Sequence, residues 1–391
     1  MTKRICVVTG SRAEYGVMYW LLHDMRADPG IDLQLLVTGM HLSPEFGMTI
    51  RDIEKDGFPV ARRVEMLLSS DSAGGIAKSI ALGIIGMSDA FEQLKPDYVL
   101  VLGDRFEILA AAQASLIHGI PLIHVAGGDT TEGAFDESIR HAITKMAHVH
   151  FVTNSDAGRR LRQMGEDEHQ IHLVGSLGLD HIRRTTLLDR PALQASLGAE
   201  LGPRNLLITF HPVTLEPKAG EDQFLQLLAA LELVDPDVKL WFTRPNADTG
   251  GRALSLALDQ WAGARKGRAH IYTSLGQLRY LSLMAQVNAV VGNSSSGLYE
   301  APSFKVPTVD IGDRQRGRLA AASVLHCAAE HTAILSAINA ALALDCSGVV
   351  NPYGDGETAG RIMQVLHTLP PPAALLQKHF HMVGDDLAQS R

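Results

Sequence analysis

The stretch His124–Lys145 reads HVAGGDTTEGAFDESIRHAITK, and it decides which fold the chain can adopt. It starts at the end of an apolar run, Pro121–Val125, breaks at two glycines and then carries acids, hydroxyls and an Arg-His pair. A short apolar run before glycines is typical of a buried β-strand, and the segment from Phe135 has helical spacing. A polar turn between strand and helix forms the pocket of many α/β proteins. A surface loop before an ordinary helix would give the same pattern, so the rest of the chain must decide.

Charged side chains recur at helical spacing in this stretch. Asp136 and Arg140 are four residues apart, and so are Glu137 and His141. Residues four apart lie on one face of a helix. We therefore expect two polar pairs in the first turns of a helix that begins near Phe135.

The same alternation of strand and helix extends over the whole chain. Apolar runs that end in polar or glycine-containing turns predict strands at 4–8, 33–38, 98–102, 121–125, 149–153 and 171–174, and again at 206–210, 239–243, 269–272, 287–291 and 306–311. Nearly continuous apolar strands indicate parallel sheets covered on both faces. The predicted fold class is α/β, with two Rossmann-like domains.

Chain length supports this division, because 391 residues exceed the ~100–200 residues of one typical domain. We expect an N-terminal domain over 1–180 and a C-terminal domain over 181–391, with the mixed-charge segment Asp180–Pro203 as the hinge region. The last helical segments, after Tyr353–Gly356, could pack back on the first domain. Ligands of open parallel sheets bind at the carboxyl ends of the strands, so the two domains are expected to face each other across a cleft.

Composition excludes several classes of protein. A net charge of −8 argues against a nucleic-acid-binding surface. The three cysteines, Cys6, Cys327 and Cys346, form neither a disulfide framework nor a CxxC metal site, which favours the reducing cytoplasm. No apolar run approaches the roughly 18–20 residues of a membrane span, and the first run is a strand rather than a signal peptide.

Two motifs follow strands of the first half. TGSRAEYG stands at Thr9–Gly16, where small residues, a helix start and Arg12 suit a phosphate or carboxylate. A plain strand–helix turn with an exposed arginine would read the same way. GDR places Asp104 and Arg105 at another strand end. The two could pair with each other, or Asp104 could act as a base while Arg105 contacts a substrate.

Histidines end two of the predicted strands. His211 follows the run at 206–210 within FHPVT, and this position favours a functional role over a structural one. His41, within GMHL, is a weaker candidate of the same kind. No Cys/His cluster has the spacing of metal ligands.

The string GNSSSGLYE at Gly292–Glu300 resembles a phosphate cradle. Ser294 and Ser295 offer hydroxyls beside the N–H groups of a helix start, and Glu300 could hold the two hydroxyls of a ribose one turn later. The N-cap of a structural helix is the alternative. The string GDRQRGR brings Arg314 to the neighbouring strand end.

Taken together, these motifs resemble those of the hydrolysing UDP-N-acetylglucosamine 2-epimerases of sialic-acid and legionaminic-acid pathways. The matching strings are SRAEYG, GDRFEILA, TEGAFDESIRHAITK, HPVT, NADTGG, GNSSSG with Glu300, GDRQ-G and YGDG, in this order over almost the whole chain. The resemblance implies an enzyme with the two-domain glycosyltransferase-B-like fold.

By the same resemblance, the C-terminal domain binds UDP. The implied contacts are His211, Asn246, Ser294, Ser295 and Arg314, with Glu300 on the ribose and Ser274 and Gly276 beside the uracil. Arg12 and Arg105 of the first domain match contacts to the diphosphate or the sugar, and His41 is a further binding candidate.

The resemblance also implies a mechanism. A carboxylate removes the C2 proton while UDP leaves C1, and water then adds to the resulting 2-acetamidoglucal. Asp104, Asp136 and His211 match the proton-transfer candidates, and Arg140 would orient Asp136. Neither NAD nor a divalent metal ion is implied, and a homodimer or homotetramer is expected.

The chain departs from many such relatives at two positions. Ala126 stands where they carry Glu or His, and Asp129 where they carry Glu. Residue 126 is therefore excluded as a catalytic group, so Asp129 or Glu132 becomes a candidate for the missing carboxylate, or the sugar differs. UDP-N-acetylglucosamine is the default substrate, and a UDP- or GDP-linked 2,4-diacetamido-2,4,6-trideoxyglucose is the alternative. A non-hydrolysing epimerase, a glycosyltransferase and a nucleotide-sugar sensor without turnover are less favoured.

Overall fold

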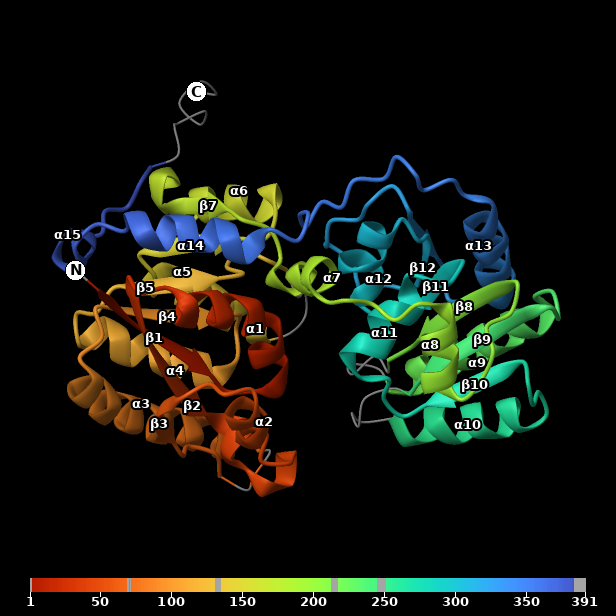
Figure 1. The fold of residues 1–391 in the computed structure, drawn as a ribbon, viewed down its shortest axis with the longest axis horizontal. Coiled ribbons are helices and arrows are strands. Elements are labelled where there is room, and N and C mark those ends of the chain that lie inside the picture. The colour runs from red at the N-terminus through yellow and green to blue at the C-terminus, as the bar shows by residue number, and fades with distance from the viewer. Residues whose placement is uncertain are drawn as a thin grey trace, which may run out of the picture. The chain divides into compact units, whose positions relative to one another are not determined.

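The computed structural model describes residues 2–68, 70, 72–130, 135–211, 217–244 and 251–382. The chain divides into two compact units: unit 1 comprises Met1–His181 and Tyr353–Arg391, and unit 2 comprises Ile182–Pro352. Each unit is built on a parallel β-sheet (Figure 1). The predicted α/β fold class, with two Rossmann-like halves, is therefore confirmed.

Unit 1 contains a seven-stranded sheet in the order β3-β2-β1-β4-β5-β6-β7. All its strand pairs are parallel. The strands are β1 (Lys3–Thr9), β2 (Ile31–Thr38), β3 (Val60–Val64), β4 (Tyr98–Leu102), β5 (Leu122–Val125), β6 (Val149–Val152) and β7 (Ile171–Leu173). The strand order reverses between β1 and β4, and the carboxyl ends at such a switch point are where open α/β sheets bind ligands.

Helices cover both faces of this sheet. They are α1 (Arg12–Ala27), α2 (Ile50–Lys55), α3 (Ala73–Leu94), α4 (Phe106–Ile117), α5 (Phe135–Met146), α6 (Ser155–Gln163), α14 (Thr358–Thr368) and α15 (Pro372–Leu375), with short 3₁₀ turns η1 (Gly39–Leu42), η2 (Pro44–Phe46), η3 (Glu168–Gln170) and η4 (Leu177–Leu179). On one face α1 and α14 share a core with β1 and β4; on the other, α3, α4 and α5 share a second core.

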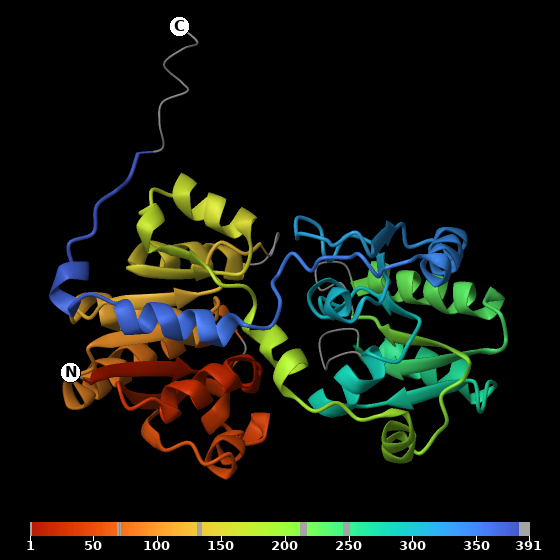
Figure 2. The ribbon, with the colours of Figure 1, turned by 45° about the horizontal axis from the view of Figure 1, so that its top comes forward.

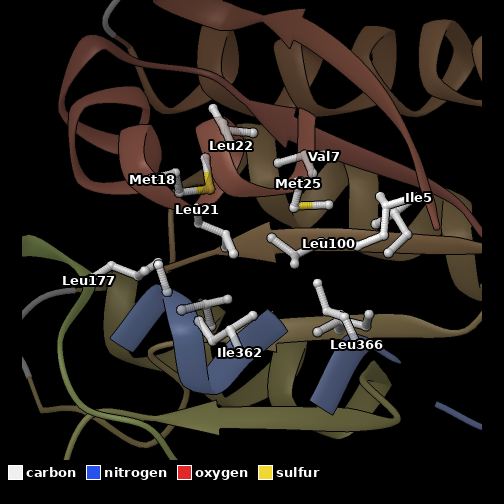
Figure 3. Packing of buried hydrophobic residues seen from close by; sticks show 14 of the residues in the cluster. Ile5, Val7, Met18, Leu21, Leu22, Met25, Leu100, Leu177, Ile362 and Leu366 are labelled. Atoms are coloured by element: carbon white, nitrogen blue, oxygen red, sulfur yellow. The ribbon is translucent and has the colours of Figure 1, made fainter. Parts of the chain in front are cut away.

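Figure 3 shows how the first of these cores is filled. Leu21 of α1, Leu100 of β4 and Ile362 of α14 lie in one buried cluster. Helix α14 therefore completes unit 1 although it follows unit 2 in the chain (blue in Figures 1 and 2). Its first turn is capped by Asp180, whose carboxylate accepts the N–H groups of Thr358 (3.2 Å) and Ala359 (3.0 Å).

Unit 2 contains a six-stranded parallel sheet in the order β10-β9-β8-β11-β12-β13. Its strands are β8 (Arg204–Thr209), β9 (Val238–Thr243), β10 (Ala269–Tyr272), β11 (Ala289–Gly292), β12 (Thr308–Ile311) and β13 (Val324–Cys327). Its helices are α8 (Arg190–Leu197), α9 (Pro217–Leu233), α10 (Gly251–Gly263), α11 (Gly276–Met284), α12 (Ser296–Tyr299) and α13 (His331–Ala343), with η5 (Ala301–Phe304); α7 (Asp180–Arg184) contains the boundary between the units.

The order of the strands in unit 2 reverses between β8 and β11. His211 follows β8 and the serine-rich string follows β11, so both lie at this second switch point. In the described part of the chain, no helix has the length and apolar character needed to span a bilayer.

Candidate functional site

The polar motifs of unit 1 meet at one edge of its sheet. Arg12 follows β1, Asp104 and Arg105 follow β4, and Asp129 lies in the turn after β5. Because neighbouring strands are parallel, their carboxyl ends lie at the same edge. Residues as far apart in the sequence as Arg12 and Asp129 thus lie at the same edge, and α5 adds further charged side chains.

Arg140 of α5 is the centre of this cluster. Its guanidinium is buried, forms an ion pair with Asp104 and donates to the backbone carbonyl of Asp129. A second ion pair, 3.7 Å long, joins it to Glu137. Glu137 also lies 3.6 Å from His141, the structural pairing expected for these two residues. Arg140 thus fastens the start of α5 to the end of β4.

Asp136 lies beside this ion pair and is partly buried. Burial, followed by the negative charge of Asp104, raises its pKa, although the nearby charges of Arg105 and Arg140 oppose the shift. Arg140 was expected to orient Asp136. It acts on Asp136 through its charge, while the ion pairs of its guanidinium run to Asp104 and Glu137. The site therefore contains one carboxylate fixed by an arginine and a second whose proton is held more tightly than usual.

Asp129 is fixed at the next strand end. Its Oδ1 accepts hydrogen bonds from the Thr153 hydroxyl (2.5 Å) and the Asn154 amide (3.3 Å), both at the end of β6. The turn before it contains Ala126 with a φ of 63°, a left-handed conformation that is uncommon for a residue with a side chain. Glu132, the other candidate for the missing carboxylate, lies outside the described residues.

Arg105 pairs with acids other than its neighbour in the sequence. It donates to both carboxylate oxygens of Glu107 (3.2 and 3.0 Å) and lies 3.7 Å from Glu14. Asp104 pairs with Arg140, so the predicted alternative of a mutual Asp104–Arg105 ion pair is wrong. The Arg105 side chain is 36% exposed, which leaves it accessible at the switch point.

The two remaining candidates of unit 1 differ in exposure. Arg12 is largely exposed. Its only ion pair in the described part of the chain is with Asp52, with 4.0 Å between Nε and Oδ2. His41 is fully buried, and its ring nitrogens contact the hydroxyls of Thr9 (3.1 Å) and Thr49 (2.8 Å). Burial lowers its pKa to about 4, so the ring is neutral. Any effect of His41 on a ligand would therefore pass through the threonines.

In unit 2 a buried asparagine, Asn293, joins three strand ends. Its side chain accepts the N–H of His211 (2.7 Å) and donates to the carbonyl of the same residue (2.9 Å). Its own carbonyl accepts from Arg314 (3.0 Å) and from the Gln315 amide (2.8 Å). Asn293 thus sets the backbone of His211 and anchors Arg314, two of the predicted nucleotide contacts.

The serine-rich turn depends on a close approach of two backbones. A Cβ on Gly292 would lie 1.9 Å from the carbonyl oxygen of Thr209, and its φ is 138°. Only glycine fits there. Beyond it, the Ser296 hydroxyl contacts Tyr280 (2.5 Å) and Ser294 (3.2 Å), and Ser295 precedes the first turn of α12. These contacts fix the hydroxyls of Ser294 and Ser296 relative to each other.

Glu300, which follows this turn, has a buried carboxylate oxygen, Oε2, without a hydrogen-bond partner. Burial raises its pKa to about 7. An unpaired buried acceptor is unfavourable in the absence of a donor, so a ligand hydroxyl is a suitable partner for it.

The other predicted residues of unit 2 lie near the same edge or outside the described residues. Ser274 and Gly276 are exposed at the start of α11, where the Ser274 hydroxyl accepts the Gly276 N–H at 3.2 Å. Asn246 and the Pro-Val-Thr that follows His211 lie outside the described residues. Sequence reasoning missed Glu14, Glu107, Asn293 and Gln315, all of them buried. All four stand inside motifs quoted above, which was the available signal.

A cation site is not evident in the described part of the chain, which has no group of three or more His, Cys, Asp or Glu side chains arranged to hold a metal ion. The side chains at the two strand edges can transfer protons and bind anions. Unit 1 supplies carboxylates and arginines, and unit 2 supplies hydroxyls, N–H groups and one buried carboxylate.

Comparison with known proteins places these motifs in a family. A family model described as UDP-N-acetylglucosamine 2-epimerase matches residues 23–367. The chain is 41% identical over 326 residues to the GDP/UDP-N,N'-diacetylbacillosamine 2-epimerase (hydrolyzing) of Campylobacter jejuni, which covers 83% of this chain and 84% of that protein. It is 34% identical over 378 residues to the UDP-N,N'-diacetylbacillosamine 2-epimerase (hydrolyzing) of Legionella pneumophila, covering 97% and 99%.

Solved structures agree on the fold. The structure of UDP-GlcNAc 2-epimerase from Neisseria meningitidis bound to UDP-GlcNAc matches with a TM-score of 0.74 at 18% identity, over 94% of this chain and all of that one. At this identity the likeness extends to the fold alone.

Proposed function

Since this chain is an enzyme of the UDP-N-acetylglucosamine 2-epimerase family, we propose that it is a hydrolysing 2-epimerase of UDP-linked 2-acetamido sugars. The reaction cleaves the bond between the anomeric carbon and UDP and inverts the configuration at C2. Its products are UDP and the free manno-configured sugar.

The proposal rests on the two carboxylates of unit 1. Asp104 is paired with Arg140, whereas the pKa of Asp136 is raised by burial and by Asp104. A carboxyl group that holds its proton more tightly than usual, close to a carboxylate fixed by an arginine, suits acid–base catalysis. This single contrast favours a proton-transfer enzyme over a binding protein without turnover.

The first step is an elimination. Asp136 takes the proton from C2, the C2 electrons form the C1–C2 double bond, and the C1–O bond breaks with its electrons leaving on UDP. The C2 proton is weakly acidic, so the enzyme must lower the activation barrier largely by stabilising the departing diphosphate. Arg314, the serine-rich turn and the arginines of unit 1 are the cationic and N–H donors assigned to this task.

The second step adds water to the 2-acetamidoglucal. A water oxygen bonds to C1, its proton passes to an enzyme base, and a proton is delivered to C2 on the face opposite to the one that lost it. Asp104, Asp129 and His211 are the groups assigned to these transfers, with Asp129 the described candidate for the carboxylate missing at Ala126. The proposed chemistry needs neither NAD nor a divalent metal. We also propose that the enzyme is a homo-oligomer.

Unit 2 is assigned the nucleotide. Ser294, Ser295, Arg314 and His211 would contact UDP, with the buried Oε2 of Glu300 accepting from a ribose hydroxyl. The predicted contacts Ser274 and Gly276 would line the base.

A second substrate is supported by the comparisons. The relatives from Campylobacter jejuni and Legionella pneumophila are both named for diacetylbacillosamine. A UDP- or GDP-linked 2,4-diacetamido-2,4,6-trideoxyglucose is therefore proposed beside UDP-N-acetylglucosamine. In this sugar an acetamido group replaces the C4 hydroxyl and the C6 hydroxyl is absent, so it has two hydroxyls fewer.

The test is turnover in D₂O with the two UDP sugars and the GDP-linked diacetamido sugar in parallel. We expect UDP or GDP and the free manno-configured sugar, with one solvent deuterium at C2, from at least one substrate. A product that keeps the original hydrogen at C2, or a nucleotide-linked epimer as the stable product, would overturn the proposal. The preferred substrate is the one with the higher kcat/KM.

A further inference from the structure

At the switch point of unit 1 lie two buried acids that have no role in the proposed reaction. Glu14 of α1 is 5% exposed, and Glu107 of α4 is fully buried. Both contact Arg105, the partly buried arginine that follows β4. A buried cluster of two acids and one base needs an explanation, because an uncompensated charge in the interior is unfavourable.

The contacts of the two acids with Arg105 are unequal. Glu107 accepts two hydrogen bonds from the guanidinium, at 3.2 and 3.0 Å, which is a bidentate pair. Glu14 lies 3.7 Å from Nε, and its Oε1 has no hydrogen-bond partner; its Oε2 accepts the N–H of Gly10 at 2.7 Å. Glu107 therefore matches the single positive charge of Arg105, and Glu14 remains as an excess acid.

The backbone is shaped around this pair of acids. A Cβ on Gly39 would lie 2.9 Å from the Glu107 side chain, and the φ of Gly39 is 58°. The end of β2 thus closes over Glu107 only because residue 39 is glycine. Met40, the next residue, places its sulfur 3.3 Å from the Arg105 guanidinium. Arg105 is consequently held by Glu107, Glu14 and Met40, while its side chain remains 36% exposed.

We propose that Glu107 and Glu14 are positioning residues for Arg105, and that Glu14 holds a proton so that the cluster is neutral when the anionic substrate binds. The inference deepens the proposed function, because it assumes that Arg105 contacts the nucleotide sugar. Glu107 fixes the guanidinium, and the proton on Glu14 keeps a second negative charge away from a diphosphate.

Electrostatics support this distribution of charge. Burial raises the pKa of Glu14 to about 8; the Gly10 N–H opposes the shift, the charge of Glu107 adds to it, and Arg105 opposes it. The other groups near the cluster are Asp136 of α5, which interacts with Arg105, and His41 of η1, which is neutral. Loss of the proton would change the net charge of Glu14, Glu107 and Arg105 from zero to −1.

The first test needs no substrate. A group whose pKa is raised in the folded state destabilises the fold as pH rises from its unfolded value toward its folded value. The melting temperature of Glu14→Gln, minus that of the wild type, should therefore increase between pH 5 and about pH 8 and level off above. Glu92→Gln, an exposed glutamate on α3, is the matched control and should show no such increase.

A difference that stays constant with pH would overturn the inference, because Glu14 would then be ionised throughout. Failure of Glu14→Gln to fold would also overturn it, since glutamine has the shape and charge of the protonated acid. Both outcomes are independent of whether the enzyme turns over any tested sugar, so they are separate from failure of the proposed function.

The second test uses the preferred nucleotide sugar. The wild-type KM should rise above pH 8, by up to about tenfold per pH unit if only the protonated form binds, and this rise should be absent in Glu14→Gln. A purely structural role would lower activity at all pH values alike. An alkaline rise in KM that persists in Glu14→Gln would contradict the inference.

Discussion

The two units share an architecture but differ in the type of side chain at the carboxyl ends of their strands. At the switch point of unit 1 the side chains are charged: Asp104 with Arg140, and Arg105 with Glu107. At that of unit 2 the turn is held by neutral groups, such as the Asn293 amide and the Ser296 hydroxyl. Glu300 is the one carboxylate of the serine-rich string.

This difference follows from what each type of group can do. Carboxylates with different proton affinities can exchange protons with a substrate, while fixed N–H groups, hydroxyls and amides bind anions and hydroxyls without titrating near neutral pH. We therefore interpret unit 1 as the half that supplies the carboxylates for proton transfer. Unit 2 then supplies most of the nucleotide contacts, together with one proton-transfer candidate, His211. Substitutions in the two units should separate kcat from affinity.

The largest effect is expected at Asp136. Asp136→Asn keeps the shape of the side chain but removes its ability to accept a proton from C2. We expect kcat to fall by roughly 10²–10⁴-fold, with UDP affinity unchanged within about twofold. Turnover with the preferred sugar and calorimetric titration with UDP provide the two numbers.

The comparison requires a control in the same helix. Ser138→Ala changes an exposed position of α5 two residues away and should leave kcat unaffected. If Asp136→Asn retains near-normal turnover, Asp136 is not the C2 base, and Asp129 becomes the described carboxylate to test next.

A smaller effect, on binding, is expected at Glu300. A hydrogen bond to an ionised carboxylate contributes about 1.5–3 kcal/mol, so Glu300→Gln should weaken UDP binding by roughly 10–100-fold. Because burial raises the pKa of Glu300 to about 7, wild-type UDP affinity should increase as pH rises through 7, when the carboxylate forms. The glutamine variant should lose this increase. Equal pH profiles for the two proteins would remove Glu300 from the ribose site.

A still smaller loss of UDP binding is expected at Asn293, which acts through its neighbours. Asn293→Ala removes two hydrogen bonds to the backbone of His211, and the loss of such a bond costs about 1–3 kcal/mol. UDP binding should weaken about tenfold. The dependence of kcat on pH should stay the same as in the wild type. Asn293→Asp retains the acceptor for the His211 N–H and should recover part of the loss. A variant with normal UDP affinity would show that His211 does not need this anchor.

How far the sequence could predict this molecule is clearest at its strands. The central strands were predicted because both faces are buried, as in β4, where Tyr98, Val99, Leu100 and Val101 are all buried. Strands β3 and β13 were missed. Both are edge strands: β3 reads VARRV with two exposed arginines, and β13 is only half buried. An edge strand needs little apolar surface, so its pattern is weak.

The sequence predicted where the site lies, but it did not predict which acid forms an ion pair with which arginine. Parallel topology brings strand ends together, and this explains why Asp104, Arg105 and Asp129 could be grouped from their motifs. Which acid holds which base depends on distances in space: Arg140 reaches an aspartate 36 residues away, and Arg105 turns to Glu14 and Glu107. Glu14 stood inside a quoted motif, but its burial and missing partner appear only in three dimensions.

The smallest effect on activity is expected at a charged cluster of unit 1 outside its strand ends. Lys378, beyond α15, donates to the carbonyls of Lys145 (2.8 Å) and Ala147 (2.6 Å) at the end of α5, and it pairs with Glu166 at 2.6 Å. Burial alone would raise the pKa of Glu166, but hydrogen bonds from His150, Lys145 and Lys378 outweigh it and bring the value to about 2. This cluster secures the far end of the helix that carries Asp136.

Lys378→Met should lower the free energy of unfolding by about 1–2 kcal/mol at pH 7, with kcat within about twofold of wild type. The sign of the pH dependence follows from the lowered pKa of Glu166: its stabilisation is present above the unfolded value of 4.5 and is lost as pH falls toward 2. The gap between variant and wild type should therefore narrow below pH 4.5. Lys78→Met, at an exposed position of α3, is the matched control. A tenfold fall in kcat with unchanged stability would mean that charge in unit 1 serves catalysis even away from the strand ends.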